Sequence, residues 1–178
     1  MRRLTCLLGF CGFLSIQPAH AAPAPHVVHA VASFTVLADV VSHVGGAHVA
    51  VTSLVPPDGD PHEFEPAPDD ARALRQADVV FMSGEGLESW FGRLAHAAGY
   101  QGKPVIVSNG IDIHTEHDGQ QVETDPHVWN SVPNVIVWTN NIRDALIAAD
   151  PADADDFRAS AATYAAQLQT LDHDIRTA

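Results

Sequence analysis

From Val27 onward the chain alternates short apolar runs with amphipathic segments. The apolar runs, typical of buried strands, occupy residues 27–32, 49–55, 79–82 and 104–107. Amphipathic segments follow the first three runs and begin near Ser33, Pro68 and Leu87. Because strand and helix alternate at short intervals, the pattern predicts an α/β fold with a parallel four-stranded sheet flanked by helices.

Residues typical of helix starts and helix ends mark the bounds of the predicted helices. Ser33 is a candidate N-cap for the first helix, and Gly45-Gly46 is its expected end. Pro68-Asp69-Asp70 opens the second helix with carboxylates in its first turn, where the helix dipole favours them. The third helix is expected to run from about Leu87 to Gly99.

The pattern changes in the last third of the chain. Residues 111–124 are polar and acidic and predict an exposed loop. A helix is expected from about Val132 to Ala149, and Asp150-Pro151 then opens a final helix of roughly seven turns. Apolar residues at alternating four- and three-residue steps form one stripe on it, which we expect to pack: Phe157, Ala161, Tyr164, Leu168, Leu171 and Ile175.

The first 21 residues have the three parts of a secretory signal peptide. Met1-Arg2-Arg3 is basic, an apolar run extends from Leu4 to Ile16, and Ala19-His20-Ala21 supplies small residues for cleavage after Ala21. The apolar run is too short to span a bilayer. A lipoprotein alternative through Cys11 is weaker, because Phe10 stands where a small residue is expected. We therefore expect a periplasmic protein with no membrane insertion after signal cleavage.

Composition narrows the choice of function. A length of 178 residues suits one ordinary domain, or one domain plus a long appended element. Nine Lys+Arg against 22 Asp+Glu give a formal net charge of −13, which argues against nucleic acid as a partner. Eleven histidines are many for this length, and neutral imidazole is a common protein ligand of transition metals. The composition therefore raises the question of a metal.

The tripeptide Asp-Pro-His occurs twice, as Asp60-Pro61-His62 and Asp125-Pro126-His127. Proline restricts the direction in which the following histidine is presented. Loops at the carboxyl ends of parallel strands converge on one crevice, where ligands bind. The pattern predicts that His62 and His127 supply half of a metal site, and that Asp60 and Asp125 bond to the imidazole rings and orient them.

The other histidines have less specific settings. His114 and His117 lie in the polar segment 111–124, either as simple loop polarity or as an accessory, low-affinity metal-collecting loop. Trp90 and Trp129 are expected to pack rather than to touch a ligand. The remaining histidines after the signal peptide are assigned to the surface or to packing: His26, His29, His43, His48, His96 and His173.

Four blocks of the sequence resemble, in order, the zinc/manganese ABC-transporter substrate-binding proteins. They are residues 59–70, residues 77–90, residues 125–134 and the helical segment that begins at Asp150-Pro151. The resemblance implies an extracytoplasmic solute-binding protein that captures Zn²⁺ or Mn²⁺ and passes it to the membrane permease of an ABC transporter. By the same resemblance, His62 and His127 match the two histidine ligands of the family's N-terminal lobe.

The resemblance also implies a domain organisation. Residues 1–21 would be the signal peptide, 22–149 an N-terminal metal-binding α/β lobe, and 150–178 a long linking helix. The family's other two ligands, a His or Glu and an acidic residue, come from a second lobe that these 178 residues lack. We therefore expect a truncated chain, in which two histidines alone bind metal weakly because Zn²⁺ takes four ligands.

Two other functions stay open at this stage. A secreted metal-dependent hydrolase could use the same histidines to activate water, with Glu63 or Glu65 as the base. No His-Glu-x-x-His helix is present to support it, so we do not expect an enzyme. A metal-independent adhesin or interaction module is the second alternative. The choice between zinc and manganese also stays open, although the short His segment favours zinc.

Overall fold

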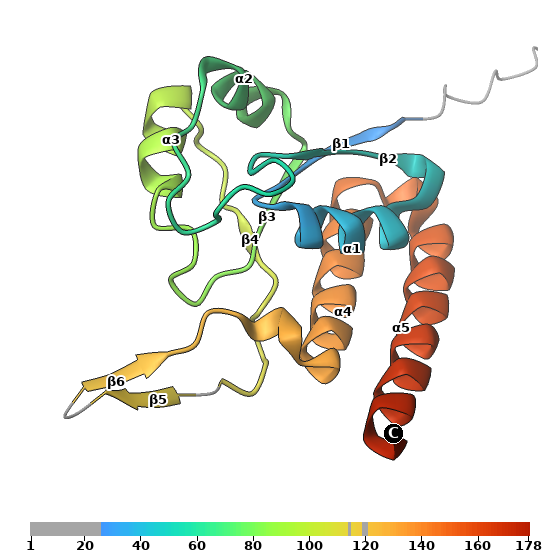
Figure 1. Ribbon diagram of the computed structural model, residues 1–178. Helices are drawn as coiled ribbons and strands as arrows, with labels where there is room; N and C mark the ends of the chain where they lie inside the picture. The colour runs from blue at the N-terminus through green and yellow to red at the C-terminus, as the bar shows by residue number, and fades with distance from the viewer. Residues whose placement is uncertain (1–25, 114, 119–120) are drawn as a thin grey trace, which may run out of the picture.

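The computed structural model describes residues 26–113, 115–118 and 121–178. Its centre is a parallel four-stranded sheet in the order β2-β1-β3-β4 (Figure 1). The strands are β1 (Val28–Ala32), β2 (Val49–Ser53), β3 (Val79–Met82) and β4 (Val105–Ile106). All four lie within the predicted runs, so the predicted α/β fold is confirmed.

Helices cover both faces of the sheet (Figure 1). On one face, α2 (Pro68–Gln76) packs against α3 (Phe91–Ala98). On the other, α1 (Thr35–Gly45), α4 (Val132–Ala149) and α5 (Ala154–Thr177) pack against one another. The central strands β1 and β3 are buried almost throughout, as expected for strands covered on both faces.

Two predicted helix starts are wrong. The first helix starts at Thr35 without a side-chain cap, because the hydroxyl of Ser33 donates instead to the Glu88 carboxylate at 2.7 Å. The third helix starts at Phe91, after turns that begin with Gly84 and Gly86 at positive φ. Its predicted end is confirmed, since Gly99 has a left-handed conformation with φ 65°.

The acidic segment 111–124, predicted to be a loop, contains an antiparallel hairpin of β5 (Thr115–Asp118) and β6 (Gln121–Thr124). The hairpin projects away from the sheet and the helices (Figure 1). Its polar sequence has no apolar alternation, so the usual strand pattern is missing. His114 lies outside the described residues, and of His117 only the place in β5 is described.

The end of the chain departs from the predicted pattern in two ways. Asp150 caps the short helix η3 (Pro151–Asp153), accepting from the N–H of Ala152 at 3.0 Å, and α5 begins only at Ala154. The predicted stripe packs along part of its length. Phe157, Ala161 and Leu168 are buried, Tyr164 is half-buried, and Leu171 and Ile175 are exposed. None of the helices in the described part of the chain has the length and apolarity that a membrane crossing requires.

Candidate metal site

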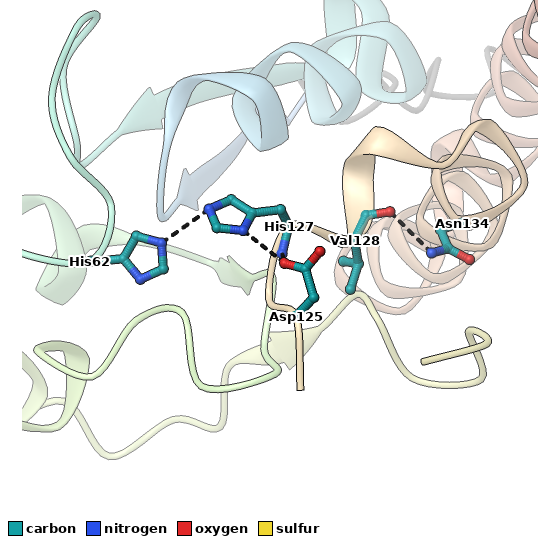
Figure 2. Close-up of polar contacts among 5 residues, drawn as sticks. All are labelled: His62, Asp125, His127, Val128 and Asn134. Carbon is teal, nitrogen blue, oxygen red and sulfur yellow. Dashed lines mark hydrogen bonds and ion pairs between the residues drawn. The ribbon is translucent and has the colours of Figure 1, made fainter. Parts of the chain in front are cut away.

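The two Asp-Pro-His turns meet in the folded chain. The Nε2 atoms of His62 and His127 lie 3.2 Å apart, with ring centroids 5.2 Å apart (Figure 2). His62 follows the carboxyl end of β2, and His127 immediately precedes the short helix η2 (Val128–Asn130), which leads into α4. The structure therefore brings together two imidazoles that are 65 residues apart in the sequence.

The same local hydrogen bond shapes both turns. The carboxylate of Asp60 accepts from the backbone N–H of His62 at 2.8 Å, and that of Asp125 accepts from the backbone N–H of His127 at 2.9 Å. Aspartate is suited to such bonds because its short side chain reaches the backbone two residues ahead. The repeated tripeptide thus encodes one repeated turn geometry.

The two aspartates differ in their relation to the rings. Oδ1 of Asp125 also accepts from the ring Nδ1 of His127 at 2.8 Å (Figure 2). Among the described contacts, Asp60 bonds to the backbone of His62 and not to its ring. Because a carboxylate is an acceptor, Nδ1 of His127 carries the hydrogen, and Nε2 of the neutral ring has its lone pair directed towards His62.

A tryptophan side chain supports each turn. The indole N–H of Trp90, which is 1% exposed, donates to the carbonyl of Pro61 at 2.7 Å. The ring of Trp129 lies 5.3 Å from that of His127 and 4.8 Å from that of Phe34. Trp90 packs as predicted, whereas Trp129 packs and also contacts a site histidine.

Asn134, the last residue of the block 125–134 that resembles the family, had no role predicted from the sequence. Its side chain is 6% exposed and donates to the carbonyl of Val128 at 3.0 Å (Figure 2). This bond joins the first turn of α4 to η2, directly after His127. A polar residue one position after Pro133, at a helix start, is the sequence signal that could have indicated such a role.

A cavity of about 490 Å³ lies beside His127. The side chain of His127 is 45% exposed, so the site is open to solvent. The cavity has two carboxylates and several amide or hydroxyl groups in its wall, which suits a hydrated cation better than an apolar ligand. Its polar lining consists of Asp112, Thr115, Asp125, His127, Asn130, Ser131 and Asn134.

The distance between the two imidazole nitrogens suits a shared metal ion. Nitrogens bound to one tetrahedral Zn²⁺ at about 2.0–2.1 Å are separated by about 3.3–3.4 Å. The Nε2 atoms of His62 and His127 are 3.2 Å apart, so small ring movements would suffice. A single ion between the rings would leave its other positions open to further donors.

Comparison with known proteins assigns the chain to a family. Residues 30–178, which include both Asp-Pro-His turns, match the family model described as zinc-uptake complex component A, periplasmic. The chain belongs to this family. The family assignment confirms the resemblance found in the sequence.

Individual members of the family show the extent of the likeness. The chain is 33% identical over 174 residues to the metal ABC transporter substrate-binding lipoprotein FimA of Streptococcus parasanguinis, covering 94% of this chain and 56% of FimA. It is 40% identical over 147 residues to the manganese-binding lipoprotein MntA of Halalkalibacterium halodurans, covering 82% and 47% respectively. The chain spans about half the length of these relatives.

A solved structure in the same family has the same fold. The Mn-bound periplasmic metal-binding protein of Candidatus Liberibacter asiaticus superimposes with a TM-score of 0.72 at 27% sequence identity. The superposition covers 79% of this chain and 52% of that protein. Over the superimposed residues, the chain described here therefore has the fold of a metal-binding receptor.

Proposed function

We propose that this chain captures a divalent transition-metal cation, Zn²⁺ or Mn²⁺, outside the cytoplasm and passes it to the membrane permease of an ABC importer. The observation that supports the metal role is the 3.2 Å approach of His62 and His127, with one ring oriented by a carboxylate. FimA is named as a metal ABC transporter substrate-binding lipoprotein and MntA as a manganese-binding lipoprotein, and both names support the same class of cargo.

In this proposal the two histidines are not equivalent before metal binds. The ring of His127 is already held by Asp125 with Nε2 as an acceptor, so the N–H at Nε2 of His62 donates to it. A metal would replace that hydrogen atom. His62 must then carry its proton on Nδ1, because a neutral imidazole ligates through its unprotonated nitrogen.

Three further sequence expectations belong to the same proposal. Residues 1–21 would direct export to the periplasm, residues 22–149 would be the metal-binding lobe, and residues 150–178 the linking helix. His114 and His117, next to or within the projecting hairpin, would collect metal ions with low affinity. Asp60 would act by holding the turn that presents His62, since it bonds to the backbone there.

Calorimetric titration of the purified chain with Zn²⁺ and with Mn²⁺ tests the site. We expect His62→Ala and His127→Ala each to weaken binding at this site by about 10-fold or more, because each removes one of two nitrogen ligands. His96→Ala, at an exposed position on α3, is the matched control and should bind as the unmodified chain does. Unchanged affinity in both site variants would reject the assignment.

No observation favours a metal-dependent hydrolase. Glu63 and Glu65, the candidate bases, are both exposed, and within the described residues neither bonds to the site histidines. FimA is named as a substrate-binding protein. Within the described residues, no structural feature favours the metal-independent adhesin alternative over metal capture.

A further inference from the structure

A second cluster of metal-ligating side chains lies at the other end of β2. His48 ends the short helix η1 (Gly46–His48), directly before the amino end of β2, whereas His62 follows its carboxyl end. In the folded chain His48 lies beside Asp153 and Asp156, at the end of η3 and in the first turn of α5. His48, predicted to be a surface or packing residue, is half-buried and in addition has two carboxylate partners.

Both ring nitrogens of His48 contact carboxylates. Nδ1 lies 2.6 Å from Oδ2 of Asp153, and Nε2 lies 3.1 Å from Oδ2 of Asp156. One ligand atom from each of the three residues can be chosen so that all lie within 4.8 Å of one another. These side chains come from two separate segments of the chain, which the tertiary fold joins.

The surrounding structure holds the imidazole in place. The edge of the His48 ring meets Phe157, which is fully buried, with centroids 5.9 Å apart. The side chains of His48 and Asp153 are 32% and 24% exposed. The Asp156 side chain is 66% exposed, so it is the member of the cluster with room to move towards a ligand.

The cluster has more negative charge than one neutral imidazole can satisfy. A neutral ring has a single N–H and can donate to only one of the two carboxylates, while its other nitrogen presents a lone pair. The nearest arginine on α5, Arg158, is paired with Asp155 at 2.7 Å. A divalent cation bound to that lone pair would also bind the carboxylate beside the same nitrogen. The second carboxylate, which has an oxygen within 4.8 Å of the other ligand atoms, would reach the ion after a side-chain rearrangement.

From this geometry we infer that His48, Asp153 and Asp156 form a second divalent-metal site, separate from the pair His62 and His127. One imidazole nitrogen and two carboxylate oxygens are a ligand set that Zn²⁺ and Mn²⁺ accept. Because the ligands come from η1 and from the start of α5, a bound ion would fasten the amino end of α5 to the sheet. The site would therefore stabilise the position of α5 rather than supply cargo.

The test removes the other histidines proposed to bind metal, so that only the second site can bind. In the chain carrying His62→Ala, His127→Ala, His114→Ala and His117→Ala, titration with Zn²⁺ alone should still show one bound equivalent. Adding His48→Gln or Asp156→Asn should abolish that equivalent. Asp155→Asn is the matched control, since it makes the same charge change in the same helical turn at a side chain that is 99% exposed, and it should leave binding intact.

Hydrogen exchange gives a second readout that also detects misfolding. In the chain lacking the first site, Zn²⁺ should slow amide exchange in the first turn of α5, and it should not do so after His48→Gln. Zinc that binds without slowing exchange there would show a site elsewhere and overturn the inference. The absence of any bound Zn²⁺ equivalent would also overturn the inference. Zn²⁺ binding that survives both His48→Gln and Asp156→Asn would do the same. The first site is tested separately by its own variants, so the two proposals can fail independently.

Discussion

The carboxylate of Asp125 accepts hydrogen bonds from both the backbone N–H and the ring Nδ1 of His127, at 2.9 and 2.8 Å. One side chain therefore sets the turn and also the direction of the ring. The corresponding residue of the other turn, Asp60, bonds to the backbone N–H of His62 at 2.8 Å. The two turns share the sequence Asp-Pro-His. Among the described contacts, however, only Asp125 bonds to the imidazole ring of its own turn and so fixes the orientation of that ring.

This asymmetry predicts unequal effects of two matched substitutions. Asp125→Ala should weaken Zn²⁺ binding by about 10–100-fold, the range typical for loss of a carboxylate that orients a ligating histidine. Asp60→Ala removes only a backbone hydrogen bond in the turn and should weaken binding less. Titration of the two variants side by side measures the difference, and equal losses would contradict the orienting role of Asp125.

A second prediction concerns the tryptophan that supports the first turn. Trp90→Phe keeps most of the buried ring but removes the N–H that donates to the Pro61 carbonyl, so metal affinity should fall. Trp138→Phe is the control, because Trp138 is also fully buried and its indole N–H has no hydrogen-bond partner within the described residues. We expect Trp138→Phe to leave affinity unchanged. Equal affinities in the two variants would argue against positioning by Trp90.

The third prediction is about stability at the carboxyl ends of β1 and β3. The Glu88 carboxylate is 6% exposed and accepts from the hydroxyl of Ser33 and from the backbone N–H groups of Ser83 and Gly84. Glu88→Ala leaves these donors without an acceptor, and each unsatisfied buried group costs about 1–3 kcal/mol. Urea unfolding should show a loss of about 3 kcal/mol or more, and less for Glu88→Gln. A loss no larger than that of Glu63→Ala, at an exposed position, would disprove this account.

The fourth prediction is a loss of stability at alkaline pH. Burial raises the pKa of both tyrosines, Tyr100 and Tyr164, and the charge of Asp39 raises that of Tyr164 further. The folded chain therefore holds the phenolic protons more tightly than the unfolded chain, whose tyrosines have a pKa near 10. This contribution to stability is complete below pH ~10 and is lost as the pH rises through the folded values.

Urea unfolding between pH 8 and pH 11 measures this effect. The free energy of unfolding should decrease above pH ~10, the ordinary tyrosine range. The double substitution Tyr100→Phe and Tyr164→Phe should reduce that decrease. Since Lys103 is the only lysine in the chain, few other side chains titrate in this range. The same alkaline decrease in the double variant would refute the assignment to tyrosine.

Much of the fold could be predicted from local patterns. The four apolar runs predicted the four strands of the parallel sheet, and the central strands β1 and β3 are almost wholly buried, as such runs indicate. Gly99 predicted the end of α3 since glycine adopts the left-handed conformation at little cost. Local patterns failed where a side chain has a distant partner, as Ser33 does in Glu88, which lies 55 residues away.

For the candidate sites, the sequence alone determined the type of chemistry. Two Asp-Pro-His turns and an excess of histidine indicated metal ligands, because local residues are enough to encode a turn and the group that it presents. Only the tertiary structure decided that Asp125, and not Asp60, orients a ring, and that His48 meets two aspartates more than 100 residues ahead. Such contacts depend on how strands and helices pack in space, and spacing along the chain does not report the packing of distant segments.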